Sequence, residues 1–286
     1  MGKKNKMLTL GVMGLCVVSV LLMKPLRSQA SHEGFAVYED WKSAPTIRSD
    51  RWRGTENPGG GQEIWRETIP GRLRMRYRFE GNTSSNSGNR SSANTLSARN
   101  PAAIDQIEAD FRVKSLVVTG CAVNQIASTV GAARLNLAAF NDGTSQAAND
   151  RTGDHYAAIL AQRSSDSPDA DGILRVLGRY SRCTNPTCST NTQVELIELP
   201  QTVKVGDKFT LRLVWDEPND RFLFGVDANP DEPLSYSGIN DADPAIGPFV
   251  TLGMFHTAAN CMQGPTVADA ETRVTEVRTN SSAVIP

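Results

Sequence analysis

The segment from Arg72 to Phe79 alternates arginine with a large apolar residue, in the order RLRMRYRF. Successive side chains of a β-strand point to opposite faces, so Leu73, Met75, Tyr77 and Phe79 would share one face and the arginines the other. A helix would scatter both sets around its circumference. The segment therefore predicts a strand with one face in an apolar core and a row of guanidinium groups on the other.

The same period-two pattern recurs along the chain. Phe209–Trp215 alternates apolar and polar residues, Asp216–Asp220 predicts a five-residue turn, and Phe222–Val226 alternates back, which is typical of a β-hairpin. Sustained helical periodicity is absent from the sequence. Residues 81–100 are mostly Asn, Ser, Thr and Gly and are expected to form a polar loop. Short strands separated by turn residues predict an all-β sandwich or barrel.

The first 30 residues have the layout of a secretory signal peptide. Lys3, Lys4 and Lys6 precede an apolar run over residues 7–23, and residues 28–30 (Ser-Gln-Ala) suit a cleavage site. An uncleaved anchor is the alternative, because the run reaches the lower length limit for a membrane span. Both interpretations predict a secreted protein, periplasmic or extracellular, and only the second predicts contact with a membrane. Residues 31–286 contain no Pro-rich linker and are expected to form one domain with flexible ends.

The net charge does not indicate a nucleic-acid partner. The chain has 30 basic and 31 acidic residues, and the predicted leader contains five basic residues and no acid. Its removal leaves 25 basic and 31 acidic residues, a net charge of −6. A chain with excess acid does not attract a polyanion through its overall charge.

Four cysteines remain after the leader is removed, and an even number in an oxidising compartment favours two disulfides. Three pairings are possible. Cys183 and Cys188 flank a turn at Asn185-Pro186, which favours a bond between them and leaves Cys121 with Cys261. A metal site is the rival interpretation of Cys183 and Cys188, but no histidine lies near them in the sequence.

Several motifs follow one another in an order seen in a known superfamily. They are Tyr38–Trp41 (YEDW), Gly71–Met75 (GRLRM), Ile107–Val113 (IEADFRV), Val205–Asp216 (VGDKFTLRLVWD) and Thr272–Val277 (TRVTEV). In this order the chain resembles the concanavalin A-like lectin/glucanase superfamily. The resemblance spans nearly the whole mature chain and implies a two-sheet antiparallel jelly-roll β-sandwich, whose expected partner is a polysaccharide or a cell-surface glycan.

The glucanases of this superfamily carry a Glu-x-Asp-x-Glu motif on a central strand. Glu108 and Asp110 match its first two acids, but Arg112 stands where the third is expected. That third acid would protonate the leaving group, so hydrolysis by this route is not expected. A polysaccharide-cleaving enzyme with a non-standard site is the alternative, with His155 and Tyr156 as additional candidates.

The arginine face is the predicted ligand site, made of Arg72, Arg74, Arg76 and Arg78 with Trp65. Guanidinium forks suit the carboxylate or sulfate groups of an acidic polysaccharide, and an indole can stack on a sugar ring. No catalytic residue is assigned.

A second interpretation satisfies these arginines within the protein. If Pro70-Gly71 makes a two-residue turn, Glu67 faces Arg74, Trp65 faces Arg76 and Glu63 faces Arg78. Two ion pairs and one cation–π contact would then neutralise most of the row on a solvated surface. We favour this interpretation, because opposite-charge pairs commonly complete a sheet face.

A further acidic segment contains no basic residue. Its acids are Asp227, Asp231, Glu232, Asp241 and Asp243. Calcium is bound by oxygen ligands from such loops, but the spacing matches no defined calcium loop, so we expect no cofactor, with a structural calcium as the alternative.

The sequence therefore leaves three functional hypotheses. The first is a secreted non-catalytic protein that binds carbohydrate or another surface polymer, and the second is a hydrolase or lyase with a non-standard site. The third is a structural component of the cell envelope.

Overall fold

The computed structural model describes residues 34–42, 46–57, 61–123, 127–237 and 242–283, without the side chains of residues 55–57 and 61–65. The predicted signal peptide lies outside these ranges. Within them, no helix has the length and apolar character needed to cross a membrane.

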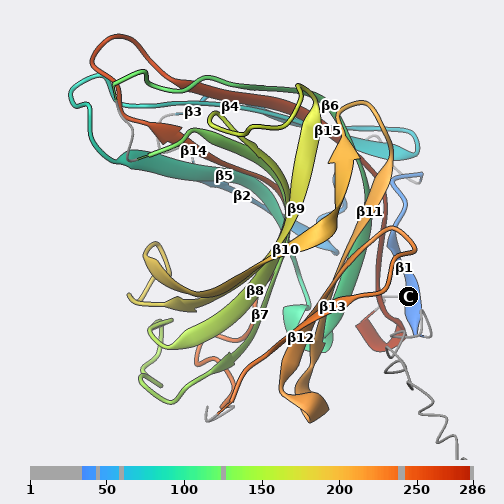
Figure 1. The fold of residues 1–286 in the computed structure, drawn as a ribbon. Coiled ribbons are helices and arrows are strands. Elements are labelled where there is room, and N and C mark those ends of the chain that lie inside the picture. The colour runs from blue at the N-terminus through green and yellow to red at the C-terminus, as the bar shows by residue number, and fades with distance from the viewer. Residues whose placement is uncertain (1–33, 43–45, 58–60, 124–126, 238–241, 284–286) are drawn as a thin grey trace, which may run out of the picture.

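Two antiparallel sheets form the sandwich shown in Figure 1. Sheet A contains, in spatial order, β13 (Glu232–Ser235), β12 (Arg221–Val226), β11 (Phe209–Asp216), β6 (Gln106–Val118), β15 (Val267–Asn280), β4 (Arg72–Glu80) and β3 (Gly61–Ile69), with β1 (Phe35–Glu39) also paired to β15. Sheet B contains β10 (Asn191–Lys204), β9 (Ile173–Cys183), β8 (Asp154–Ser164), β7 (Val130–Asn141), β14 (Val250–Ala259), β5 (Asn89–Ala98) and β2 (Trp52–Asn57). The predicted all-β, two-sheet antiparallel sandwich is confirmed.

The only helical elements among the described residues are three single-turn 3₁₀ segments, η1 (Pro101–Ala103), η2 (Glu217–Asn219) and η3 (Ser281–Ala283). The second of these forms the turn of the predicted β11–β12 hairpin. Asp216 and Arg221 are already paired across the strands, so the loop has four residues, not the five that were predicted. The hairpin itself is confirmed.

The alternating arginine segment is strand β4. Its apolar residues Leu73, Met75, Tyr77 and Phe79 are completely buried between the sheets, while its arginines face outward from sheet A. On the opposite side of the core, sheet B contributes the inward-facing side chains of strands β7, β8 and β14. The predicted division of β4 into a core face and an arginine face is confirmed.

The loop predicted over residues 81–100 is wrong for its second half. Residues 89–98 form β5, which pairs with β14 on one side and β2 on the other. Its inner residues include buried Leu96 and Asn94, and the Asn94 amide donates a hydrogen bond to the Arg76 carbonyl oxygen (3.1 Å). The strand is inconspicuous in the sequence because its outer face consists mostly of small hydroxyl-bearing residues and a polar amide, Asn94, stands on its inner face.

Both predicted disulfides are present. Cys121 is bonded to Cys261, across a sequence separation of 140 residues, and Cys183 is bonded to Cys188. The long-range bond joins the segment after β6 to the segment after β14. The short bond closes the loop between β9 and β10.

Candidate functional site

The arginine face lies on the outer surface of sheet A, in the register that the sequence predicted. Glu67 pairs with Arg74, Trp65 with Arg76 and Glu63 with Arg78 across β3 and β4. The side chains of Glu63 and Trp65 are outside the described residues, so the predicted cation–π contact and the second ion pair stay predictions.

Acids from β15 and β4 also meet these arginines. Arg74 forms ion pairs with Glu67 and with Glu271 (3.4 Å), and Arg76 pairs with Asp269 (3.1 Å). Arg78 pairs with Glu80 at 2.9 Å. Acidic side chains therefore pair with most of the arginine row. The sequence did not reveal the two acids from β15, Glu271 and Asp269, because that strand is nearly 200 residues away in the chain. The binding role of Arg72, Arg74, Arg76, Arg78 and Trp65 stays a prediction.

The two acids of the glucanase-like motif are also on the outer side of sheet A. Glu108 and Asp110 are buried, and Arg278 pairs with both. Burial acts to raise the pKa of Asp110, but Lys208 at 2.8 Å and neighbouring donors outweigh it and hold the pKa below its usual value. A carboxyl group that stays ionised in this way is a poor proton donor to a leaving group.

The other two catalytic candidates lie elsewhere. His155 is buried inside the sandwich, where it is stacked on Phe140 and hydrogen-bonded to Tyr180. Tyr156, the next residue, lines a groove on the outer face of sheet B. The structure therefore does not bring Glu108, Asp110, His155 and Tyr156 together.

The groove that includes Tyr156 runs across the outer face of sheet B and has a volume of about 510 Å³. Two cross-strand rows run beneath it, each with one residue from β5, β14, β7, β8 and β9, and six of these ten residues line it. The first row contains Ser97, Thr251, Asn136, Ala158 and Arg179. The second row contains Thr95, Gly253, Arg134, Leu160 and Leu177.

Two small residues, Gly253 and Ala158, occur in these rows. A Cβ atom on Gly253 would lie 2.2 Å from the carbonyl oxygen of Asn94, so only glycine fits between β5 and β7 at this point. Ala158 in the adjacent row contributes a single methyl group. Longer side chains, among them Arg134, Arg179 and Phe255, line the groove.

Two of these long side chains are arginines that share one aromatic neighbour. The guanidinium carbon of Arg134 lies 4.6 Å from the centre of the Phe255 ring, and that of Arg179 lies 5.9 Å from the same centre. Burial, together with the positive charge of Arg179, lowers the pKa of Arg134 to about 10. With a pKa of about 10, Arg134 still carries a positive charge at neutral pH.

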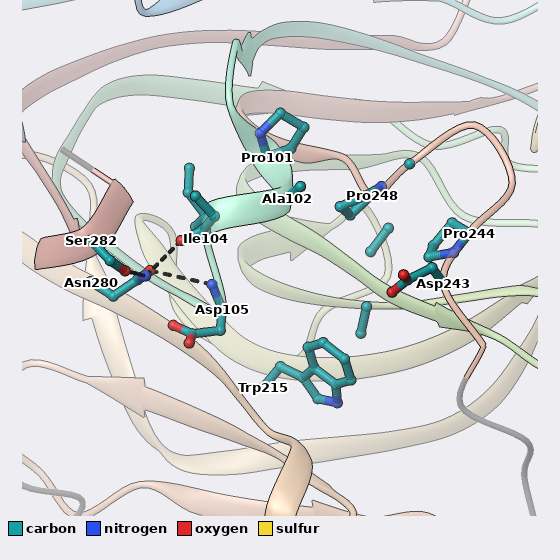
Figure 2. A pocket seen from close by; sticks show the side chains of 14 residues that line it. Pro101, Ala102, Ile104, Asp105, Trp215, Asp243, Pro244, Pro248, Asn280 and Ser282 are labelled. Atoms are coloured by element: carbon teal, nitrogen blue, oxygen red, sulfur yellow. Dashed lines mark hydrogen bonds between the residues drawn. The ribbon is translucent and has the colours of Figure 1, made fainter. Parts of the chain in front are cut away.

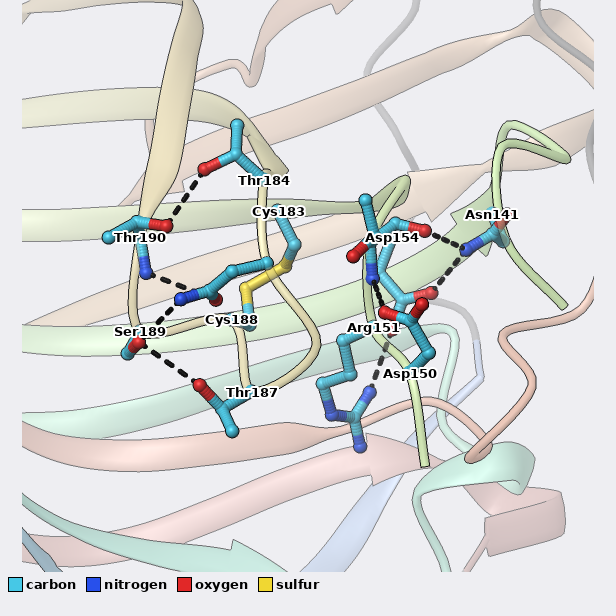
Figure 3. Close-up of a disulfide and its surroundings, with 12 residues drawn as sticks. Asn141, Asp150, Arg151, Asp154, Cys183, Thr184, Thr187, Cys188, Ser189 and Thr190 are labelled. Atoms are coloured by element: carbon cyan, nitrogen blue, oxygen red, sulfur yellow. Dashed lines mark hydrogen bonds and ion pairs between the residues drawn. A yellow bond between two sulfur atoms is a disulfide. The ribbon is translucent and has the colours of Figure 1, made fainter. Parts of the chain in front are cut away.

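One rim of the groove is the loop closed by the Cys183–Cys188 disulfide, drawn in Figure 3. Thr187 and Ser189 of this loop line the groove together with Arg151. The backbone N–H of Arg151 donates to the Pro186 carbonyl oxygen (3.0 Å), and its guanidinium pairs with Asp154 (2.9 Å). The disulfide loop is thus held against the β7–β8 loop, and both are fixed beside the groove.

A second pocket, of about 580 Å³, opens at one end of the sandwich and is shown in Figure 2. Trp215, Pro244 and Pro248 supply apolar surface, and Asp105 and Asp243 supply carboxylates. Asp105 is exposed to solvent on one side. The protein atoms around its carboxyl group still remove part of its hydration, which raises its pKa. Neither pocket was anticipated from the sequence.

The acidic segment from Asp227 to Asp243 is partly used within the protein. Asp231 forms a buried ion pair with Arg212, and Asp227 accepts a hydrogen bond from the Thr210 N–H (2.8 Å). Asp241 is outside the described residues. In the part of the chain that the structure describes, no group of three or more His, Cys, Asp or Glu side chains is arranged to hold a metal ion.

Comparison with known proteins finds matches among solved structures alone. No protein-family profile and no curated protein sequence matches the chain. Among solved structures, the laminarinase from Flavobacterium sp. UMI-01 aligns with a TM-score of 0.46 and 11% identity over 85% of this chain and 98% of that one. LamAcat from Zobellia galactanivorans aligns with a TM-score of 0.48 and 11% identity over 88% of this chain and 100% of that one. The Emp47p carbohydrate recognition domain aligns with a TM-score of 0.42 and 11% identity over 88% of this chain and 99% of that one.

The two antiparallel sheets form a sandwich consistent with the jelly roll that the motif order in the sequence predicts. The aligned structures include both a laminarinase and a carbohydrate recognition domain. Function therefore has to be argued from the residues of the site.

Proposed function

We propose that this protein is a secreted, non-catalytic binding protein for a carbohydrate polymer, which it holds in the groove of sheet B. The composition of the groove carries this proposal. Its described lining combines arginines, hydroxyl and amide groups with the rings of Tyr156, Phe249 and Phe255, and contains neither Asp nor Glu.

The shape and chemistry of the groove suit a chain of sugars. A site of about 300–1,000 Å³ is typical for ligand binding, and this groove falls within that range. Aromatic rings offer apolar faces, while hydroxyl and amide groups provide hydrogen bonds in both directions. Because the floor extends across five strands, an extended polymer can contact several of them at once.

The same composition argues against hydrolysis in the groove. Glycoside hydrolysis generally requires a pair of carboxyl groups on either side of the scissile bond. The groove-lining residues of β7 and β8 include Arg134, Asn136 and Tyr156, none of which is an acid. Glu108 and Asp110 lie on the opposite sheet, where cations bind them.

Export is consistent with the two disulfides, since such bonds persist in oxidising compartments outside the cytosol. The predicted leader over residues 1–30 points in the same direction. Periplasmic or extracellular placement is tested by fractionation, with the N-terminus of the mature protein determined by mass spectrometry.

A tryptophan placed in the groove tests the proposal. Ala93 is partly exposed in the groove wall, so Ala93→Trp should fill the groove and abolish binding on a polysaccharide array. Val117, 56% exposed on β6 of the other sheet, provides the control Val117→Trp, which adds the same indole away from the groove. Equal binding by both variants and the wild type would remove the groove from consideration.

Catalysis is tested with the same polysaccharides. We expect the wild-type protein to release neither reducing ends nor unsaturated products. Product release that disappears in Glu108→Gln would overturn the non-catalytic assignment and restore the enzyme as the leading function. The envelope-component hypothesis predicts instead a stable protein partner in envelope extracts and no polysaccharide binding.

A further inference from the structure

The groove contains two cations that no carboxylate neutralises within the described part of the chain. Arg134 and Arg179 make no ion pair there, whereas Arg151 at the groove rim does, as do Arg74, Arg76 and Arg78 on sheet A. The Nε atom of Arg179 is buried and lacks a hydrogen-bond partner. The terminal nitrogens of a guanidinium without a carboxylate partner remain suited to an anionic ligand.

Neutral groups hold these two cations in place. The Phe255 ring lies beneath both guanidinium groups. With the Asn136 amide oriented so that both its oxygen and its nitrogen have hydrogen-bond partners, the oxygen accepts a hydrogen bond from Arg134 (3.2 Å). An aromatic face attracts a cation without cancelling its charge. The arginines are therefore positioned in advance while their charge remains available to a ligand.

The two like charges also repel each other. Arg179 contributes to the lowered pKa of Arg134, which is the expected effect of a second cation nearby. An anion bound between them would relieve this repulsion. Each guanidinium fork matches the oxygens of a carboxylate or a sulfate ester, which neutral sugar hydroxyls cannot match in charge.

We infer that the groove is selective for polysaccharides that carry anionic groups, sulfate esters or carboxylates, and that Arg134 and Arg179 bind one such group together above Phe255. This inference rests on the proposed binding function and narrows it to acidic polymers. The sequence analysis also expected an acidic ligand, but on the arginines of sheet A. The inference places that ligand on Arg134 and Arg179 of sheet B instead.

Two matched pairs of polymers test the inference by affinity electrophoresis or calorimetry. Dextran sulfate is compared with dextran, and polygalacturonate with its methyl ester, so each pair differs mainly in its anionic groups. We expect the wild-type protein to bind at least one charged polymer, to bind its neutral counterpart at least tenfold more weakly, and to lose affinity as salt rises. Preference for dextran sulfate or for polygalacturonate identifies the anionic group.

Single substitutions locate the contact. Arg134→Gln and Arg179→Gln should each weaken binding of the charged polymer by about 10- to 100-fold, the loss expected for a charge-assisted hydrogen bond. Arg112 is exposed on the outer face of sheet A, so Arg112→Gln removes the same charge from the opposite sheet and should change nothing. Arg134→Lys and Arg179→Lys keep the charge and lose the fork. They should bind with intermediate affinity, and they serve as the test if a glutamine variant does not fold.

The outcomes separate this inference from the proposed function. Equal binding of charged and neutral polymers that Ala93→Trp abolishes would overturn the inference and leave a groove for neutral carbohydrate. Binding that neither Ala93→Trp nor the arginine variants alter would overturn both. Failure of the folded protein to bind any of the four polymers would also overturn the inference.

Discussion

Arg134 lies with its guanidinium carbon 4.6 Å from the centre of the Phe255 ring, on the neighbouring strand β14. The two residues are on different strands of one sheet face, and the same ring also supports Arg179. Phe255 thus links the only two groove arginines that lack an ion pair among the described residues. Its ring determines how far above the floor their charge is presented.

The ring should therefore matter for ligand affinity more than for folding. Phe255→Leu keeps an apolar side chain but removes the aromatic face, and cation–π contacts are worth about 0.5–2 kcal/mol. We expect a loss of severalfold in affinity for the charged polymer and a small change in melting temperature. Phe249 also lines the groove but lies beneath Arg151, which Asp154 already neutralises, so Phe249→Leu should weaken binding of the charged polymer less than Phe255→Leu does. Equal losses in both variants would contradict a specific role for Phe255.

The arginine face of sheet A gives a contrasting prediction. Arg74 and Arg76 have side chains that are 27% and 36% exposed and are paired with acids, and each such surface ion pair contributes about 0–1 kcal/mol. The double variant Arg74→Gln/Arg76→Gln removes three such ion pairs and should lower the free energy of unfolding by at most about 3 kcal/mol. Its affinity for the charged polymer should match the wild type. A large loss of affinity in the folded variant would instead restore this face as the ligand site.

The two disulfides should have separable effects. In the chain-entropy model, closing 140 residues contributes about 5 kcal/mol of stability and closing five residues about 2 kcal/mol. Cys121→Ser/Cys261→Ser should therefore lower the unfolding midpoint in urea the most and leave the affinity of the folded protein intact. Cys183→Ser/Cys188→Ser should cost less stability but weaken binding, because Thr187 and Ser189 of the released loop line the groove.

Acid should destabilise the protein through His256. Burial lowers the pKa of this ring to about 4, although the carbonyl oxygens of Phe255 and Tyr77 lie at hydrogen-bonding distance from its two nitrogens and oppose the shift. In the unfolded chain the pKa is about 6.5, so between the two values the unfolded state binds more protons. Stability is therefore lost as the pH falls from about 6.5 towards 4, by about 3 kcal/mol in all.

The variant His256→Gln tests this prediction. For the wild type and for the variant, the free energy of unfolding is measured at two pH values, and the two differences are compared. Between pH 7 and pH 5, urea unfolding of the wild type should show a loss that is about 2 kcal/mol larger than that of the variant. His155 also has a lowered pKa, caused mainly by burial, and adds a loss of the same sign in both proteins. An unchanged pH dependence in the variant would show that His256 is not the titrating group.

Local pattern determined much of this structure. Alternation in the chain identified β4, its buried face and the β11–β12 hairpin, because a strand places successive side chains on opposite faces whatever surrounds it. The Pro70-Gly71 turn set the register that pairs Glu67 with Arg74. Cysteine spacing indicated both disulfides, and the motif order indicated the jelly roll. Strand β5 was missed, because hydroxyl side chains on its outer face conceal a strand whose few apolar residues point inward.

The candidate site depended on tertiary structure. The sequence by itself determined that Arg134 and Asn136 share a strand face, since residues two apart always do. Only the folded chain decided that β7 lies between β8 and β14, which brings Arg134, Arg179 and Phe255 together from positions far apart in the sequence. It also decided that the acids of β15 meet the arginines of β4, while the arginines of sheet B meet an aromatic ring. Alternation tells which side chains share a face, but only the order of the strands determines which other residues lie beside them.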